Sequence, residues 1–361
     1  MKFTIVALAL AFLSACSSLS IQRSQEATQS LPENADFQRI EQQMKSQSFD
    51  AALASAQSFK KDYPYSLKIQ KVRFYEANAL EELGRWSEAA DTYKAISTIS
   101  ERNQPEISAM AIYRLSFVYE ALGDDQRVIT SLFEAAKYHK YLPMEVIQAE
   151  IPSRLAMVYA KENNAKEAQK WLGEADKGLK KTLESTTEPL TDAWLAELYY
   201  NMGSISTEQL SNDNIQTIIQ GQSAVQKYLI RSLQYNDPIW SAKALKKLNG
   251  TYLDLWKAIE VYPEPSGYEP LVAQKMKKDA QIQLAGPFAE LIRDAELYRP
   301  GAEQKSNQYQ TAFFNFLEEL QTRVRSVLDS SVITPLMPGR DKTPQKPRGP
   351  VKIVPSEDPN L

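Results

Sequence analysis

Residues able to perform nucleophilic, acid–base or metal chemistry are few in this chain. Its 361 residues include one cysteine, Cys16, and one histidine, His139, so a zinc site built from several histidines is excluded by count. His139 lies at the end of an expected helix, where a cation offsets exposed carbonyl groups. The chain also lacks a glycine-rich phosphate loop. We therefore expect no metal and no cofactor, and only chemistry based on Asp and Glu remains open.

The overall charge excludes some partners. The chain carries 42 Lys and Arg against 45 Asp and Glu, which gives a formal net charge of -3. Nucleic-acid-binding proteins and polybasic membrane-surface proteins carry a clear excess of positive charge. We therefore expect no nucleic-acid partner and no electrostatic membrane patch.

The elements that position the remaining side chains are helices, and the clearest pair lies between residues 70 and 101. Small and apolar residues recur there at helical spacing in two blocks, with a Leu-Gly-Arg-Trp turn between them. This pattern predicts two antiparallel helices joined by a tight turn. Gly84 is placed to take the left-handed conformation that ends the first helix, and Trp86 to fill the wedge between the two.

This hairpin resembles a tetratricopeptide repeat, whose pattern is matched by Ala77, Gly84, Trp86, Ala89, Tyr93 and Ile96. Three further units, starting near Glu33, Ala109 and Ala149, show the same pattern, and the unit starts are spaced by 37, 39 and 40 residues. A single hairpin cannot bury its own apolar face, so the units are expected to stack. The resemblance covers residues 33 to about 179 and implies a superhelix whose first helices line a concave face.

Period-two alternation of useful length is absent from the sequence, so we expect an all-α fold: a tetratricopeptide-like superhelix with irregular C-terminal helices and a disordered tail. The expected organisation is a signal peptide over 1–15, a flexible tether over 16–36, repeats over 37–180, further hairpins with degenerate repeats over 190–331, and a proline-rich tail over 332–361. The tail carries five basic residues among its prolines, a composition typical of an extended, solvated segment: Arg340, Lys342, Lys346, Arg348 and Lys352.

The N-terminal residues resemble a bacterial lipoprotein signal. An apolar run from Phe3 to Leu13 is too short to span a membrane, and Leu13-Ser14-Ala15-Cys16 is similar to a lipobox. The resemblance implies cleavage before Cys16, lipid (including palmitate) on that cysteine, and, with Ser17 following, anchoring in the outer membrane facing the periplasm. An ordinary signal peptide with an incidental cysteine is the alternative.

A candidate partner site lies on the expected helix over 108–122. Its predicted core stripe is Ile112, Leu115, Ser116, Tyr119 and Leu122, but Met110, Tyr113 and Phe117 make the opposite stripe apolar as well. A helix that is apolar nearly all round must be covered all round. Either a neighbouring or C-terminal helix of the same chain covers the second stripe, or a partner does. In the second case the predicted partner-binding groove is Phe74, Asn78, Tyr113, Phe117 and Met157.

Two functions from different classes follow from these observations. The first is a non-enzymatic, lipid-anchored scaffold or adaptor that faces the periplasm and binds proteins of an envelope assembly through a helical-repeat groove. In anchor plus repeats it resembles the lipoprotein of the β-barrel assembly machinery and the pilotins of type IV pili. The alternative is a carboxylate-dependent, peptidoglycan-active enzyme on a helical scaffold, although Glu184-Ser185 lacks the glycine-rich and aromatic surroundings of the lytic transglycosylase motif.

Overall fold

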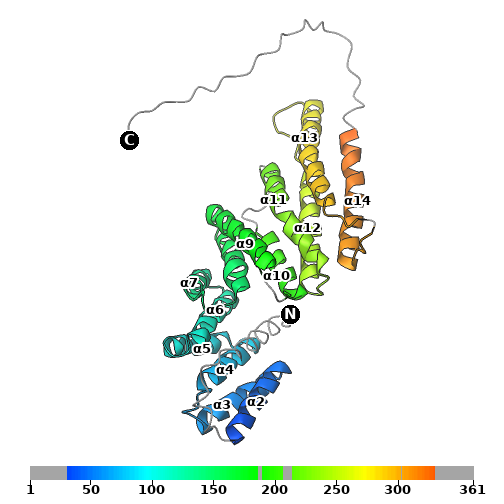
Figure 1. The fold of residues 1–361 in the computed structure, drawn as a ribbon. Helices are drawn as coiled ribbons and strands as arrows, with labels where there is room; N and C mark the ends of the chain where they lie inside the picture. Colours follow the sequence, from blue (N-terminus) through cyan, green and yellow to red (C-terminus); the bar gives the residue numbers. More distant parts are fainter. Residues whose placement is uncertain (1–30, 186–188, 206–213, 302, 330–361) are drawn as a thin grey trace, which may run out of the picture.

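The computed structural model describes residues 31–185, 189–205, 214–301 and 303–329, and within these ranges it contains helices and turns but no β-strand. The helices follow one another in an elongated stack, with α2 and α3 at one end and α13 and α14 at the other (Figure 1). This confirms the expected all-α fold. The signal peptide, Cys16 and the proline-rich tail lie outside the described residues.

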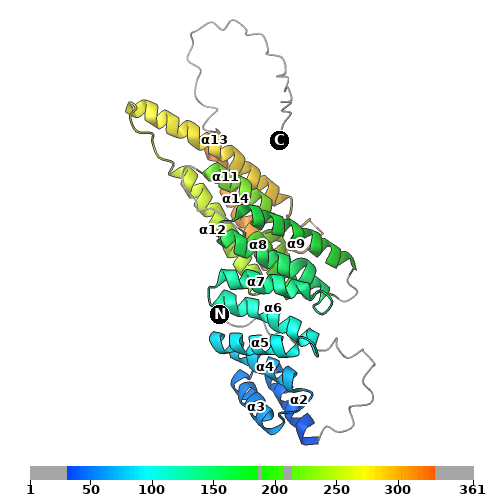
Figure 2. The same ribbon diagram turned by 90° about the vertical axis from the view of Figure 1, so that its left-hand side faces the viewer.

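Four helical hairpins form the first half of the stack, and they lie side by side in chain order (Figure 2). Each has a first and a second helix, as the tetratricopeptide pattern predicts. The pairs are α2 (Leu31–Lys45) with α3 (Phe49–Asp62), α4 (Ile69–Glu82) with α5 (Trp86–Ser100), α6 (Pro105–Ala121) with α7 (Asp125–Lys137), and α8 (Ile151–Lys161) with α9 (Ala165–Ser185).

The same turn ends the first helix of every hairpin. After α4, the Arg85 N–H donates to the Leu80 carbonyl at 2.8 Å and the Gly84 N–H to the Glu81 carbonyl at 2.9 Å, which is a Schellman motif with its left-handed residue at Gly84. The left-handed residues of the four turns are Gln47, Gly84, Gly123 and Asn163, with φ between 58° and 73°. They are spaced by 37, 39 and 40 residues, so the predicted repeat lengths are confirmed.

Stacking buries one continuous apolar cluster from Phe37 in α2 to Val158 in α8. Alanines at the helix crossings, such as Ala77 and Ala89, are fully buried and let the helices approach closely, while Tyr93 fills the space beside them. Burying one large apolar side chain contributes about 1.5–3 kcal/mol. The cluster therefore supplies the stability that a single hairpin lacks.

Helix α2 begins earlier than expected. Residues 31–36 were predicted to belong to the flexible tether, yet they form its first turns. Ser66 Oγ donates to the Glu33 carboxylate at 2.6 Å, and the Tyr63 hydroxyl donates to Asp36 at 3.0 Å. These bonds to the turn after α3 order the polar segment, which its composition alone does not show.

Two residues near predicted boundaries also differ from expectation. Leu122, predicted to lie in the core stripe, is 43% exposed because α6 ends at Ala121 and Leu122 already belongs to the turn. Thr182, predicted to start a polar break, is buried inside α9, where its hydroxyl donates to the Gly178 carbonyl at 2.9 Å.

The C-terminal helices pack on their chain neighbours, as α10 does on α11, and also on one another across the chain, which forms a bundle. Helix α11 contacts α12, α13 and α14, and the Tyr252 hydroxyl of α12 donates to Gln226 of α11. Gln226 in turn donates to the Leu291 carbonyl of α13 at 3.2 Å. This part comprises α10 (Asp192–Gly203), α11 (Ile215–Gln234), α12 (Trp240–Glu260), α13 (Pro270–Glu296) and α14 (Gln308–Asp329). Throughout the described ranges, no helix is long and apolar enough to cross a membrane.

A short π-helix, Val146–Glu150, runs directly into α8. Helix α9 packs against it so closely that a Cβ at Gly178 would lie 1.6 Å from the Gln148 carbonyl oxygen. Only glycine permits this approach. The π-helix and α9 are therefore locked together at this point.

We predict that Gly178→Ala lowers the free energy of unfolding by about 2 kcal/mol or more, because the new methyl group forces α9 away from the π-helix. Gly173→Ala is the matched control in the same helix. A Cβ there meets nothing within 4 Å, so this variant should gain up to ~1 kcal/mol from helix propensity. Urea unfolding of both variants measures the difference, and equal stabilities would contradict the packing described here.

Candidate functional site

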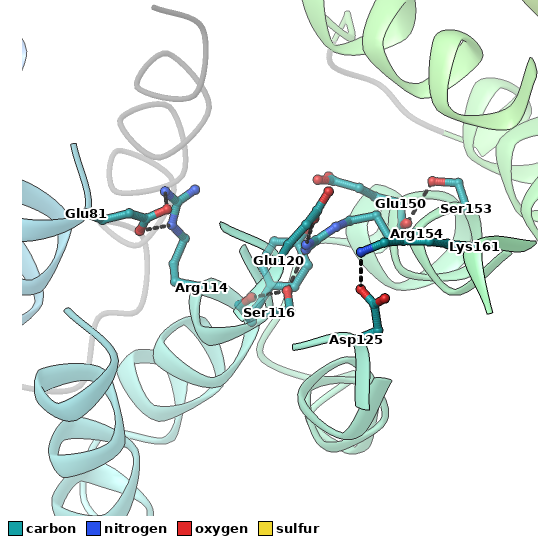
Figure 3. A network of polar contacts seen from close by, with 10 residues as sticks. Glu81, Arg114, Ser116, Glu120, Asp125, Glu150, Ser153, Arg154 and Lys161 are labelled. Atoms are coloured by element: carbon teal, nitrogen blue, oxygen red, sulfur yellow. Dashed lines mark hydrogen bonds and ion pairs between the residues drawn. The ribbon is translucent and has the colours of Figure 1, made fainter. Parts of the chain in front are cut away.

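The first helices α4, α6, α8 and α10 are joined by a line of polar side chains, which we call the polar ladder. It consists of three rungs, each linking one first helix to the next. Figure 3 shows the part of the ladder from Glu81 to Arg154. Its members are Glu81, Arg114, Ser116, Glu120, Glu150, Arg154 and Trp194.

The rung between α4 and α6 is a buried bidentate ion pair. Arg114 donates to Glu81 from Nε at 3.1 Å and from Nη2 at 2.5 Å, and the Tyr93 hydroxyl donates to the same carboxylate at 3.0 Å. Burial acts to lower the pKa of Arg114, but the Glu81 carboxylate outweighs this effect and holds the pKa above its ordinary value. Both side chains are about 5% exposed. Removing one partner of such a pair typically costs about 3–5 kcal/mol.

The rung between α6 and α8 is built around Arg154. Its guanidinium donates to Ser116 Oγ at 2.5 Å and to the Glu120 carboxylate at 2.7 Å. It also lies 3.6 Å from the centroid of the Phe117 ring, which Arg114 contacts from 4.8 Å. Each cation–π contact contributes roughly 0.5–2 kcal/mol. The Phe117 ring thus connects the first two rungs.

The rung between α8 and α10 joins Glu150 to Trp194, whose indole N–H donates to the carboxylate at 3.0 Å. Glu150 is the last residue of the π-helix and is only 7% exposed. A π-turn inserts an extra residue and so changes the direction of the side chains at its end. We infer that this local distortion aims Glu150 at α10.

A second carboxyl, Glu197, lies one helical turn after Trp194. Burial and the Glu150 carboxylate raise the pKa of Glu197 to about 8, although Arg154 and Lys243 act in the opposite direction. Burial also raises the pKa of Glu82, near the first rung, to about 7. The face formed by the first helices therefore carries two carboxyl groups that are largely protonated below neutral pH.

Two of the predicted groove residues are interior residues, which corrects the sequence-based expectation. Phe74 is buried within its own hairpin, with its ring 5.6 Å from that of Tyr93. Tyr113 is also buried, 5.2 Å from the Phe117 ring and 5.9 Å from the Arg154 guanidinium. Neither ring is open to act as an anchor for a partner, because close packing between helices takes up both.

The other three predicted residues lie at the edge of this packing. Asn78 is buried, but its amide nitrogen makes no hydrogen bond, and Phe117 and Met157 are half-buried. Their contact with a partner stays a prediction. The second apolar stripe of α6 is covered at Tyr113 and Phe117 by Arg154 of the neighbouring α8. Helices α13 and α14 pack instead on α11 and α12.

Sequence reasoning missed the charged members of the ladder, because it assigned charges on helices to solvated faces. A signal was present: Arg114 and Arg154 occupy the same position in two consecutive repeats, 40 residues apart. A charged residue that recurs at a repeat position can indicate a contact between repeats, just as a recurring alanine does. Glu81 and Glu120 recur in the same way, 39 residues apart and each three residues before the left-handed residue of its turn. Glu150 and Glu197 show no such recurrence.

The polar ladder is built from ion pairs, hydrogen bonds and cation–π contacts between neighbouring helices. Across the ranges that the structure describes, no three His, Cys, Asp or Glu side chains are grouped so that they could hold a metal ion. Two carboxyl groups with separated pKa values, such as Glu150 and Glu197, also occur in acid–base catalysis. Glu150 is buried and accepts a hydrogen bond from Trp194.

Comparison with known proteins adds little to the geometry. The chain matches no protein-family profile and no curated protein. Its structure is similar to that of BtubC (BKLC) from P. vanneervenii, with 12% sequence identity, a TM-score of 0.36, and coverage of 86% of this chain and 99% of that one. It is also similar to the TPR2AB-domain:pHSP90-complex of yeast Sti1, with 17% identity, a TM-score of 0.31, and coverage of 81% and 98%. At these values, the functional argument depends on the side chains alone.

We predict that the protein loses stability as the pH rises from about 5 to 8.5. Because the folded-state pKa of Glu197 is raised from 4.5 to about 8, the folded chain binds more protons than the unfolded chain within this window, and stability falls with pH there by up to ~1.4 kcal/mol per unit. Glu197→Gln should therefore melt at a higher temperature than the wild type at pH 8.5 and show a shallower decline. Thermal unfolding at several pH values tests this, with the exposed Glu319→Gln as a control that keeps the wild-type slope.

Proposed function

We propose that this protein is a non-enzymatic, lipid-anchored scaffold that binds partner proteins of the bacterial envelope across the face formed by α4, α6, α8 and α10. The observation that supports the partner site is a buried polar atom on α4, the Asn78 amide nitrogen, which makes no hydrogen bond of normal length. Buried polar groups in proteins are nearly always satisfied, so an exception calls for an explanation. An extended peptide backbone or polar side chain of a partner would supply the missing bonds.

The polar ladder suits this face for binding. Its rungs fix each first helix against the next through ion pairs and hydrogen bonds, so the face is formed before a partner arrives. A preformed surface avoids the entropic cost of ordering side chains on association. Stacked helical repeats commonly present such extended concave surfaces to partners.

The anchor is the second part of the proposal. The lipobox-like residues 13–16 favour a lipid on Cys16, with the chain held at the outer membrane and facing the periplasm. Residues 17–30 would then connect the lipid to α2. The repeats would lie close to the membrane, within reach of envelope proteins.

Cys16→Ala should leave an uncleaved or mislocalised precursor, because the lipid-transfer step needs the thiol. The wild-type protein should partition into detergent and carry the mass of the attached lipid. Phase partitioning and mass spectrometry of the intact protein measure both properties. A wild-type chain recovered from the periplasm in soluble form, with a free thiol, would contradict the anchor.

Met157→Arg should reduce capture of the partner by roughly thirtyfold, since losing one well-packed contact in an interface costs about 2 kcal/mol. Met276→Arg is the matched control: Met276 is 39% exposed on α13, away from the first helices. The measurement is quantitative affinity capture from solubilised membranes with the full-length chain, alongside circular dichroism to show that both variants fold. Equal capture by the two variants would contradict the proposed face.

A further inference from the structure

The connection between α12 and α13 carries large apolar side chains that the described part of the chain leaves uncovered. This loop and the first turns of α13 form the corner of the described structure farthest from α2 (Figure 1, Figure 2). The apolar residues of this corner, which we call the apolar tip, are 47% to 82% exposed: Val261, Tyr268, Leu271 and Val272. Single exposed apolar residues are ordinary on a protein surface, whereas several gathered in one place indicate a site of interaction.

The chain holds this tip apart from the bundle. Between residues 270 and 280 of α13, Ala273 is the one buried residue, whereas the second half of the helix contributes to the bundle core. At the base of the tip, the Gln281 amide donates to the Ile259 carbonyl at 3.1 Å and to the Glu260 carbonyl at 2.7 Å. The loop is further restricted by three prolines, whose φ is fixed: Pro263, Pro265 and Pro270. The tip is therefore preformed and stays exposed.

The shape of the tip favours a lipid bilayer over a folded protein as its partner. Leu271 and Val272 are consecutive in a helix, so their side chains point about 100° apart. Val261 and Tyr268 come from the loop before them. Apolar side chains thus stand on more than one side of a protruding corner, and a flat protein surface would cover only part of them. Headgroups and acyl chains rearrange around an inserted side chain and can cover all of them.

The charges beside the tip complement a phospholipid headgroup. Residues 261–280 carry three acidic and three basic side chains, so their formal net charge is zero and insertion depends on apolar contact. These side chains are Glu264, Glu269 and Asp279, and Lys275, Lys277 and Lys278. The lysines follow Leu271 by four to seven residues, which is roughly 6–10 Å along the helix. Their long stems let the ammonium groups reach lipid phosphates while the apolar side chains lie deeper.

We propose that the apolar tip inserts into the headgroup region of a phospholipid bilayer. Leu271 and Val272 then lie at the boundary between headgroups and acyl chains, roughly 5–10 Å below the surface. Lys275 lies among the phosphates, and the Tyr268 ring lies at the level where tyrosine is enriched in membrane proteins. This site is separate from the face formed by α4, α6, α8 and α10, and it requires no lipid on Cys16. It holds the end of the stack opposite α2 at a membrane.

The test is lipid quenching of a dye placed at the tip. Leu271→Cys in the full-length chain is labelled with the dye NBD and reconstituted in vesicles of phosphatidylethanolamine and phosphatidylglycerol, with and without a doxyl quencher near the headgroup end of the acyl chain. Leu297→Cys is the matched control, because Leu297 is 79% exposed at the other end of the same helix. Quenching at position 271 should exceed that at position 297 by roughly threefold or more, since only the tip reaches the depth of the quencher.

A second variant separates insertion of the tip from attraction of the dye itself to lipid. Val272→Asp, added to the labelled Leu271→Cys chain, should lower quenching roughly threefold, because a carboxylate opposes burial among acyl chains. Val272 lies in the first turn of α13, where an acidic residue is compatible with the helix. Circular dichroism checks that the variant folds.

Four results would overturn the proposal. The first is equal quenching at positions 271 and 297. The second is a label at 271 that becomes shielded only as the protein concentration rises, which would show that a second copy covers the tip. The third is shielding only when solubilised envelope proteins are added, which would show a protein partner. The fourth is quenching that appears only after the chain is shortened to end at Asp329, which would show that the tail covers the tip.

These results are distinguishable from failure of the proposed scaffold. Labelling of the wild-type chain in parallel shows how much dye reaches Cys16, and a reactive thiol there would contradict the lipid anchor while lipid quenching at position 271 would still support the tip. Capture that depends on Met157 is measured in solubilised membranes and does not involve the tip.

Discussion

The arrangement of the first helices depends on the need to pair buried guanidinium groups. Arg114 and Arg154 project from α6 and α8 into the space between neighbouring hairpins, where an unpaired charge would be costly. Each finds its carboxylate on the preceding first helix: Arg114 pairs with Glu81 of α4, and Arg154 with Glu120 of α6. Since a bidentate or forked contact tolerates little rotation, these pairs fix the angle between hairpins. Apolar packing alone would leave that angle less defined.

The same requirement explains why the site lies where it does. Rungs that contain a guanidinium are complete, and their side chains are unavailable to a ligand. The rung at Glu150 has a tryptophan N–H in place of the arginine. The π-helix that positions Glu150 is kept in register by the contact between Gly178 and Gln148. The π-helix and Gly178 together therefore position Glu150, the carboxylate that links this part of the stack to α10.

The C-terminal bundle completes the stack. Helix α11 contributes Val225 and Tyr228 to the apolar cluster around α10, and Leu229 and Leu233 to the separate cluster of the bundle. An array of repeats needs a different structure at its end, because the last hairpin would otherwise expose an apolar face. Within the bundle, α12 packs against α10. Helices α13 and α14 pack on α11 and α12.

The sequence by itself determined the hairpins, their spacing and the position of each turn. These features depend on local chemistry: a left-handed residue such as Gly84 ends a helix, and alanines at fixed intervals mark the crossings. Only the tertiary structure decided which side of α6 is buried, that Phe74 and Tyr113 are interior residues, and that the C-terminal helices form a bundle. The polar ladder joins residues 33 to 44 positions apart in the sequence. Whether a charged side chain on a helix faces solvent or a neighbouring hairpin depends on how the hairpins stack. The pattern within one hairpin does not contain that information, and only the recurrence of Arg114 and Arg154 between repeats indicates it.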